Sequence, residues 1–375
     1  MNVTHATNQR EWDEFLQSQQ FRPFLQSWTM GEVYRRIGQE PIRLMVKEGD
    51  AVRGICFAHV VPARRGRHLS VPYGPVCELK IDPSFGSGGK LKIPVLDLLM
   101  DELKKIARER DCSFIRMSPF WPKNGETNSL LRSFNIKNSP LHLLAEHLWY
   151  LPLTAHDSWA DLPLTPPPTQ TPKFEEDLFK SMRSTTRNLI RRAEKEGVIV
   201  TASADPVADL HHFLTLHDET RKRHGFTPYT NAFFRAQVEE FAKSGNVILY
   251  LARYQNEVIA SSIHMHFGGE TSYHHGASTH RFSKIPASYL LQWTAIRDAL
   301  RRGDHVYNFW GIAPPNPNPT PNPTPSRHPF AGVTLFKTGF GGHLLELTHC
   351  VDLPLSKKYY LTRGFEIVRK WRRGF

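Results

Sequence analysis

A lysine between aromatic residues and glycines is the position in this sequence best suited to carry chemistry. In the segment GVTLFKTGFGG, Lys337 follows Phe336 in a strand-like run and is followed by Gly339, Gly341 and Gly342. A lysine with apolar neighbours can be held partly desolvated, where its charge acts on negative charge that develops in a transition state. We therefore expect a catalytic role for Lys337. The alternative is that it caps a strand and pairs with an acidic neighbour.

A row of cations is the sharpest electrostatic feature. In SMRSTTRNLIRRAEKEGV, basic residues recur every fourth position, at Arg183, Arg187, Arg191 and Lys195. This spacing places them along one face of a helix. Such a face suits a phosphodiester backbone, because each contact releases counterions and no base has to be read. The alternative is a solvated face that Glu194 and Glu196 partly balance.

No motif points to a nucleotide cofactor or to a metal. The sequence has no GxSxG elbow, HExxH site, Walker A loop or GxGxxG fingerprint. His264, His266, His274 and His275 have a spacing that a metal could use, but satisfied or exposed histidines are the expected state. The four cysteines have no CxxC spacing, so buried reduced thiols are expected. We predict no cofactor and no metal site.

Length and charge limit the remaining classes of protein. A chain of 375 residues is long enough for two cores. The formal charge of +12 favours polyanionic partners such as RNA or anionic lipid. The first residues carry no apolar signal region, and no stretch of about 18 apolar residues occurs. A cytoplasmic enzyme without an integral membrane segment is expected.

The elements that position these residues form an α/β (α+β) pattern that occurs twice. In the first half, a helical pattern over 10–38 precedes two strands within 42–63, a helix over 96–110 and a strand over 113–117. In the second half, helices are predicted over 174–197, 208–224 and 231–244. A meander of strands over 247–253, 257–267 and 271–277 follows, then a helix over 288–302 and a strand over 306–309. This order is that of an acyltransferase fold.

Two proline-rich segments mark the domain organisation. DLPLTPPPTQTP, residues 161–172, is predicted to be an extended linker between the halves. Residues 313–329, with the run PPNPNPTPNPTP, are predicted to be a loop because proline lacks the amide donor of helices and central strands. We predict a first domain of residues 1–160 and 348–375 and a second of residues 173–347.

Read together, several segments resemble the FemABX family of peptidyltransferases. They are FLQSWTMGEVYRRIG, in which Met30 stands where tryptophan is usual, SVPYGPV, STTRNLIRRAEKEGV, ETRKRHGF, YNFWGI and GVTLFKTGFGG. The resemblance covers about residues 21 to 365. It implies two tandem GNAT-like acyltransferase domains with mixed β-sheets flanked by helices, without a helical-hairpin arm. Where the family carries aspartate in its YDxxGI strand, this chain has Asn308, so no charge-dependent role is assigned there.

The resemblance also implies an activity and a set of site residues. Family members move amino acids from aminoacyl-tRNA to the stem peptide of a peptidoglycan precursor, either lipid II or UDP-MurNAc-pentapeptide, for the cell-wall bridge. By position, Lys337 would be catalytic, and the precursor would contact Tyr34, Arg35, Arg36, Arg223, Tyr273 and Phe336. The cationic row from Arg183 to Lys195 would bind tRNA. The resemblance does not identify a general base.

Two other functions fit parts of the sequence. One is an acyl-CoA-dependent N-acyltransferase of the same fold, although STHRFSKIPASY, in the expected pyrophosphate turn, contains no glycine. The other is a non-catalytic protein that binds RNA or an anionic membrane, suggested by the net charge and the tail KKYYLTRGFEIVRKWRRGF. For the enzyme, a peripheral contact with the inner membrane leaflet is expected.

Overall fold

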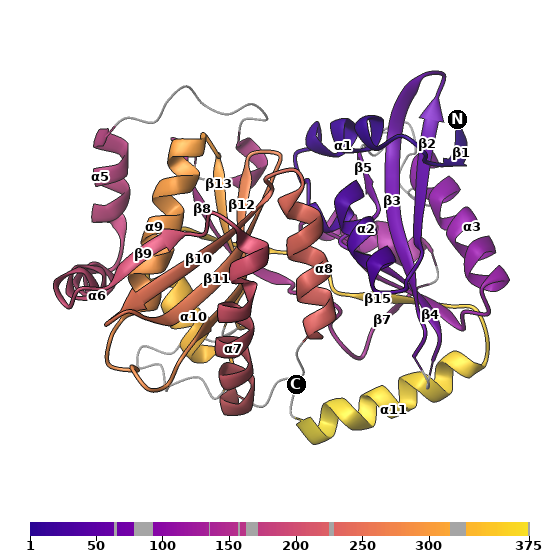
Figure 1. Cartoon of the computed structure of the whole chain (residues 1–375). Coiled ribbons are helices and arrows are strands. Elements are labelled where there is room, and N and C mark those ends of the chain that lie inside the picture. The colour runs from indigo at the N-terminus through magenta and orange to yellow at the C-terminus, as the bar shows by residue number, and fades with distance from the viewer. Residues whose placement is uncertain are drawn as a thin grey trace. The chain divides into compact units, whose positions relative to one another are not determined.

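Figure 1 shows the computed structural model of the chain. The structure describes residues 1–63, 66–78, 93–134, 136–156, 158–162, 172–224, 229–315 and 328–373. Most of the predicted linker 161–172 and of the predicted loop 313–329 lies outside these ranges.

The chain forms two compact units. The first contains Met1–Glu146 and Glu346–Phe375, and the second contains His147–Leu345. The sequence placed the boundary near 161–172, but the strand at His147–Pro152 already pairs within the second sheet. The chain therefore passes from the first unit to the second before the proline-rich segment, because the strand His147–Pro152 pairs with the distant strand Val306–Gly311.

The first unit is built on one mixed sheet. Its strands are β1 (Asn2–His5), β2 (Pro41–Glu48), β3 (Ala51–Val61), β4 (His68–Pro72), β5 (Val76–Cys77), β6 (Phe114–Ser118), β7 (Lys137–Asn138) and β15 (Val351–Pro354). The order is β1-β2-β3-β4-β6-β15-β7, and β5 pairs with β3. Its helices are α1 (Gln9–Gln17), α2 (Trp28–Arg36), α3 (Pro94–Glu109), α4 (Gly125–Ser133) and α11 (Lys358–Arg373), with a 3-10 turn at Phe24–Gln26.

The second unit is built on another mixed sheet. Its strands are β8 (His147–Pro152), β9 (Ile199–Ala202), β10 (Val247–Tyr254), β11 (Glu257–Phe267), β12 (Glu270–Ser278), β13 (Val306–Gly311) and β14 (His343–Glu346), in the order β14-β8-β13-β12-β11-β10-β9. Its helices are α5 (Pro172–Ser181), α6 (Ser184–Lys195), α7 (Pro206–His224), α8 (Asn231–Ala242), α9 (Ala287–Arg302) and α10 (Ala331–Thr338), with a 3-10 turn at Trp159–Asp161.

The same connection occurs in both units. Three antiparallel strands, β2-β3-β4 or β10-β11-β12, are followed by a helix, α3 or α9, and then by a strand parallel to the third, β6 or β13. Each of these helices buries an apolar face, which includes Leu99 and Leu103 in α3 and Leu291 and Ile296 in α9. The predicted fold class is confirmed: two tandem acyltransferase-like units with mixed sheets flanked by helices.

Three local predictions were wrong. The helical pattern over 10–38 is divided into α1, the 3-10 turn and α2, because Pro23 and the Ser27 cap of α2 interrupt it. The pattern over 174–197 is divided into α5 and α6 at Met182 and Arg183. The strand-like run around Lys337 is the helix α10, since Phe336 and Lys337 face inward from the helix rather than alternate across a sheet.

The prediction for the cysteines is confirmed. All four cysteines are free and buried, and burial raises the pKa of the Cys77 thiol to about 12. No helix in the described part of the chain is long and apolar enough to cross a membrane.

Candidate active site

Lys337 is a buried amine in the last turn of α10. The residue is 6% exposed, and its Nζ donates a hydrogen bond to the backbone oxygen of Gly311 at 2.7 Å. Nζ also lies 5.6 Å from the ring centroid of Tyr273. Burial lowers the pKa of Lys337 to about 7. Among the described residues no carboxylate forms an ion pair with it, so the amine is shared between its charged and neutral forms near neutral pH.

The two neighbouring strands that carry the contacts of Lys337, Tyr273 in β12 and Gly311 in β13, are both irregular. Strand β12 carries an extra residue, since Ile263 and His264 of β11 pair with His275 and Tyr273. Strand β13 carries another, between Asn308 and Gly311 opposite β8. The parallel pairing of β12 with β13 covers only Glu270–Ser272 and Val306–Asn308. Bulges re-aim side chains and end pairing next to functional sites.

The distorted part of β13 is held by Asn308, the residue that stands in place of the family's aspartate. Its Oδ1 accepts from the Trp310 amide at 2.8 Å, and its Nδ2 donates to Glu270 Oε1 at 2.9 Å. Trp310 has φ +67°, a conformation that non-glycine residues rarely adopt. Asn308 therefore positions Gly311, whose carbonyl holds Lys337, and a neutral amide is sufficient for this role.

Tyr273 forms the other side of the lysine pocket, and Gly276 makes room for it. A Cβ on Gly276 would lie 1.8 Å from the Tyr273 hydroxyl oxygen. The ring of Tyr273 stacks on His264 with centroids 5.4 Å apart. Burial raises the pKa of Tyr273 to about 12, so the phenol stays protonated at neutral pH. The sequence indicated Tyr273 but not its dependence on Gly276.

Aromatic side chains cover the base of α10. Phe336 is half-buried and packs edge-on against Tyr289, with ring centroids 4.9 Å apart, whereas Phe340 is fully buried. A Cβ on Gly342 would lie 2.2 Å from the Tyr150 carbonyl oxygen, and the Gly341 carbonyl accepts from Trp149 Nε1 at 2.7 Å. The glycines thus let the loop after α10 lie directly on β8, as close backbone approach requires.

The structure brings part of the cationic row to the same helix. Arg183 is the N-cap of α6, and its guanidinium contacts the Leu335 carbonyl at 3.4 Å and Thr338 Oγ1 at 3.2 Å. Arg187 donates to the Lys180 carbonyl at 2.6 Å, at the end of α5. These two residues bind the C-terminal turns of α10 and α5, where cations are favoured.

The other two members of the row face outward. Arg191 is exposed and its guanidinium lies 5.2 Å from the Phe179 ring centroid, and Lys195 is exposed in the last turn of α6. The row therefore divides into a half that supports the fold and a half that is available to a partner.

The remaining predicted residues lie elsewhere. Tyr34, Arg35 and Arg36 end α2 in the first unit. Arg35 pairs with Glu32 and with Glu40, the latter at 3.1 Å, and Arg36 is exposed. Arg223 belongs to α7, but its side chain is outside the described part of the structure.

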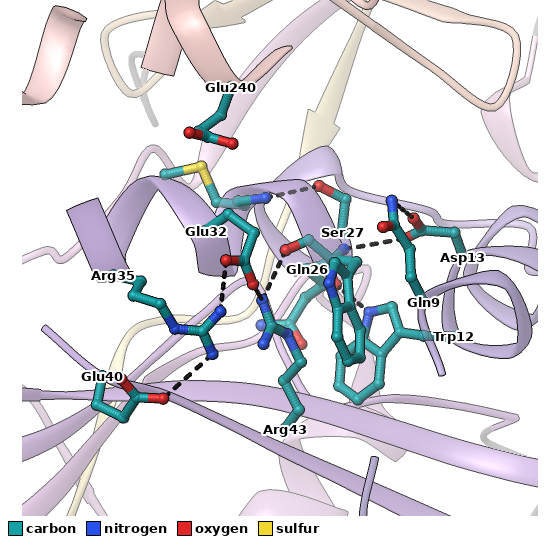
Figure 2. A network of polar contacts seen from close by, with 12 residues as sticks. Gln9, Trp12, Asp13, Gln26, Ser27, Glu32, Arg35, Glu40, Arg43 and Glu240 are labelled. Atoms are coloured by element: carbon teal, nitrogen blue, oxygen red, sulfur yellow. Dashed lines mark hydrogen bonds and ion pairs between the residues drawn. The ribbon is translucent and has the colours of Figure 1, made fainter. Parts of the chain in front are cut away.

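Figure 2 shows a buried arginine beside α2 that the sequence did not indicate. Arg43 is 5% exposed, donates to Glu32 Oε1 at 2.6 Å and stacks on Trp28 at 3.8 Å. A Cβ on Gly31 would lie 2.2 Å from its guanidinium nitrogen. Burial lowers the pKa of Arg43, against the effect of Glu32. Because Arg43 and Arg35 both contact Glu32, the end of α2 is positioned by charge, and no sequence spacing reveals this.

The described residues contain one group with metal-ligand spacing, namely His142, Glu146 and His349. Both His Nδ1 atoms face the Glu146 carboxylate, at 2.9 and 2.8 Å, and His349 Nε2 lies 2.9 Å from the Ser139 carbonyl. Since both nitrogens of His349 face acceptors, its ring is held as an imidazolium. The hydrogen bond to Glu146 raises the pKa of His349. The group is an ion-pair cluster rather than a set of lone pairs directed at a metal.

A surface pocket of the second unit lies away from this chemistry. It has a volume of about 690 Å³ and is lined by residues of α7, of the β10–β11 hairpin and of the segment after β12, including His212, Arg253 and Phe282. None of Lys337, Tyr273 and Phe336 lines it. We assign the candidate active site to Lys337 and its neighbours, where burial perturbs the pKa of a reactive group.

Comparison with known families matches each half of the chain to a different description. Residues 7–148 match the FemAB family, and residues 180–315 match an acetyltransferase (GNAT) domain. Aminoacyltransferase FemA of Staphylococcus epidermidis is 29% identical over 91 residues, which are 24% of this chain. The matched segment spans only 20% of the length of that relative.

Comparison with solved structures extends the likeness over the whole chain. The crystal structure of FemX superimposes with a TM-score of 0.74 at 18% identity, covering 98% of this chain and 100% of FemX. The C-terminal domain of a putative lysylphosphatidylglycerol synthetase from Agrobacterium fabrum gives a TM-score of 0.56 at 11% identity, covering 96% and 95%. At these identities the likeness concerns the fold.

Proposed function

Because the chain belongs to the FemABX family, we propose that it is an aminoacyltransferase of cell-wall bridge synthesis. The donor is an aminoacyl-tRNA, and the acceptor is an amine on the stem peptide of a peptidoglycan precursor, lipid II or UDP-MurNAc-pentapeptide. The protein acts in the cytoplasm, with peripheral contact to the inner membrane leaflet. The observation that carries the proposal is the buried Lys337 amine, whose pKa is lowered to about 7.

In the proposed reaction Lys337 moves one proton. Its neutral amine accepts a proton from the ammonium of the acceptor, and the freed nitrogen attacks the ester carbonyl of the aminoacyl-tRNA. The resulting Lys337 ammonium stabilises the tetrahedral oxyanion. It then gives its proton to the departing ribose oxygen as the ester C–O bond breaks. The attacking nitrogen releases its remaining extra proton to solvent as the carbonyl re-forms. A neutral amide and an uncharged tRNA are formed, Lys337 returns to its neutral form, and no cofactor is consumed.

The lowered pKa explains why one residue can serve in both steps. A general acid or base works best when its pKa lies near the operating pH. The hydrogen bond to the Gly311 carbonyl uses one N–H of the amine. The lone pair of the neutral form remains available to the acceptor. This assignment supplies the general base that the sequence left unidentified.

Other residues bind and orient the two substrates. Tyr273 and Phe336 line the groove of the stem peptide beside Lys337. Arg223, with Tyr34, Arg35 and Arg36, contacts precursor phosphates. Arg223→Lys should raise the acceptor KM, because lysine lacks the planar fork of arginine. The row Arg183, Arg187, Arg191 and Lys195 contacts tRNA, mainly through its outward members Arg191 and Lys195.

The main rival donor is an acyl-CoA, which the match of residues 180–315 to an acetyltransferase domain favours. CoA-dependent members of this fold bind pyrophosphate at the N-terminus of the helix that corresponds to α9. Here the Ala287 and Tyr289 amides already donate to the Ile285 and Pro286 carbonyls at 2.9 and 3.0 Å. This internal bonding favours tRNA as the donor.

The donor and acceptor can be identified in one assay. Purified protein is incubated with a mixture of charged tRNAs or with acetyl-CoA, and with the nucleotide-linked or lipid-linked precursor, and products are analysed by mass spectrometry. We expect a mass increase of one or more amino acid residues that requires charged tRNA and is abolished by ribonuclease. Acetylation of the precursor without tRNA would instead support the rival.

A further inference from the structure

The C-terminal helix α11 is amphipathic, and its apolar face points away from its own unit. Large apolar side chains along it are exposed, among them Leu361 at 79% and Trp371 at 83%. The others are Tyr360, Phe365, Ile367 and Val368. With 3.6 residues per turn, Leu361, Phe365 and Val368 share one stripe, and Trp371 extends it by a turn.

The opposite face of α11 attaches to the first unit through polar contacts. Glu366 pairs with Arg116 at 2.7 Å, and Arg363 donates to the Asn138 carbonyl at 2.6 Å. Tyr359, the fully buried residue of this face, donates to Asp352 at 3.2 Å. An amphipathic surface helix normally turns its apolar stripe to the core. Here the arrangement is reversed, because ion pairs hold the inward face while the apolar face stays outside.

Cations accompany the exposed apolar stripe. Lys357 and Lys358 lie at the start of the helix, and Arg369, Lys370 and Arg372 lie near its end, all exposed. Glu366 is the only acidic residue of α11, and Arg116 neutralises it. A helix with leucine, phenylalanine and tryptophan on one face and lysine and arginine beside it lies in the plane of an anionic bilayer surface. Each cation near such a surface adds about 1 kcal/mol to binding.

We infer that α11 is a membrane-docking helix, and that the ligand of this face is an anionic phospholipid bilayer. The apolar stripe inserts at the level of the acyl chains, and the flanking cations contact lipid phosphates. This inference deepens the proposed function, since it assigns the peripheral membrane contact to a particular segment. Vesicle binding needs neither precursor nor tRNA, so its failure would be separable from a failure of the transfer activity.

The test is vesicle co-sedimentation of the full chain. Vesicles of phosphatidylcholine alone are compared with an equal mixture of phosphatidylcholine and phosphatidylglycerol. We expect binding to the anionic vesicles only. The combined variant Leu361→Gln, Phe365→Gln and Trp371→Gln should lose more than about tenfold in partitioning, because three apolar side chains no longer insert. Ile199→Gln, which replaces a 64% exposed apolar residue of β9, should bind as the wild type does.

Two further variants separate the contribution of the cations to vesicle binding from the insertion of Trp371. Arg369→Gln with Lys370→Gln and Arg372→Gln should weaken binding and reduce its dependence on phosphatidylglycerol. Trp371→Phe should keep binding but remove the blue shift of tryptophan emission on vesicle addition, which would place this residue of the eight tryptophans in the bilayer. Because all substituted side chains point outward, the thermal unfolding of each variant should match that of the wild type.

Two outcomes would overturn the inference. The first is equal, weak binding to both vesicle types in wild type and triple variant. The second is a concentration-dependent dimer in sedimentation velocity that the triple variant abolishes, without vesicle binding. That result would assign the apolar face to a second copy of the chain.

Discussion

Each unit contains a buried cation, Arg116 in the first and Lys337 in the second, and the two differ in the groups that surround them. Arg116 in β6 is 6% exposed and lies between Asp352 at 2.7 Å and Glu366 at 2.7 Å. Burial alone would lower the pKa of Arg116, but the hydrogen bonds to both carboxylates outweigh it and the pKa is raised. Lys337 is equally buried, yet it has a backbone carbonyl and an aromatic ring as neighbours, and its pKa is lowered to about 7.

The difference indicates what each site is for. A compensated arginine joins β6, β15 and α11 and remains charged at every accessible pH. An uncompensated lysine costs folding free energy but retains a proton that it can exchange. Replacing each cation should therefore have opposite consequences for stability and for the proposed transfer.

The largest expected effect is on stability, from Arg116→Met. The variant leaves the Asp352 carboxylate, which is fully buried, without its cation. Breaking a buried pair in this way costs about 3 to 5 kcal/mol. Chemical denaturation should show this loss, while transfer per folded molecule stays near that of the wild type. Adding Asp352→Asn should recover part of the stability, and no recovery would mean that packing rather than charge is responsible.

Lys337→Met should produce the reverse pattern. Loss of one electrostatic group in the transition state costs on the order of 100 to 1000-fold in rate. The folded pKa of about 7 lies below the ordinary 10.5, so the unfolded chain binds the extra proton between these values. Burial of the charged amine therefore destabilises the wild type most below about pH 7. In that range the free energy of unfolding of Lys337→Met should exceed that of the wild type by about 1 to 3 kcal/mol.

Single-turnover transfer and thermal unfolding on one preparation check both parts. Lys337→Arg keeps a charge but moves it, so a substantial loss of rate there would show that placement matters. A lower melting temperature with normal turnover would mean that Lys337 is a structural residue.

A smaller effect is expected from Gly276→Ala, which tests how the Lys337 pocket is shaped. The new Cβ would meet the Tyr273 hydroxyl, so the ring below Lys337 must move. Misplacement near a reaction centre typically costs about 10 to 100-fold in kcat. Tyr273→Phe removes the nearest clashing atom but keeps the ring carbon Cζ, 2.6 Å from the new Cβ, so it should rescue the alanine variant in part. Failure of the rescue would contradict the fit between these two residues.

The His142–Glu146–His349 cluster should give a pH-dependent effect of about 1 kcal/mol. Burial alone would raise the pKa of Glu146, but hydrogen bonds from both histidines lower it to about 2. Its contribution is present above the ordinary 4.5 and lost as pH falls toward 2. The pKa of His349 is raised, so its contribution is present below the ordinary 6.5 and lost as pH rises through the folded value.

The stability difference between wild type and His349→Gln should therefore be largest from about pH 4.5 to about pH 6.5. Denaturant titrations across this range measure it. A difference that does not change with pH would exclude the ion-pair account.

The smallest effect concerns tRNA. Arg191→Gln with Lys195→Gln should flatten the salt dependence of tRNA binding by a slope of about 1 to 2. Arg183→Gln with Arg187→Gln should mainly lower stability, because these residues bind carbonyls of α10 and α5. Arg53→Gln with Lys105→Gln removes two exposed cations of the first unit as the matched control. Equal salt dependence of tRNA binding in all three variants would mean that Arg191 and Lys195 are solvated surface residues without a role in tRNA binding.

The periodicity of apolar residues and the turn residues in the sequence predicted most of the fold but only part of the candidate site. The meander β10-β11-β12 and the helix α9 have strong periodicity and clear turn residues, and both were predicted. The division at Met182 and Arg183 was missed because no proline or glycine lies between residues 174 and 196 to mark the end of a helix. Lys337 was assigned to a strand because Val333 and Thr334 favour extended structure, whereas packing against Tyr289 decides for a helix.

Long-range partners explain the rest. Arg116 and Asp352 are 236 positions apart, and Gly276 matters through its close approach to the Tyr273 side chain. No spacing rule finds such pairs. The outward apolar face of α11 was also missed, since a sequence pattern shows that a helix is amphipathic but not which face the fold covers.

The central claim is that Lys337 exchanges a proton near neutral pH during aminoacyl transfer. Its most direct test is the single-turnover rate with charged tRNA and saturating acceptor, measured from about pH 5.5 to about pH 8.5. Wild type and Lys337→Met are compared, and hydrolysis of the ester without enzyme is subtracted. We expect the wild-type rate to rise with pH through an apparent pKa near 7, as the amine becomes neutral, and the variant to be slow without this transition. The same transition in Lys337→Met, at a near-normal rate, would contradict the account.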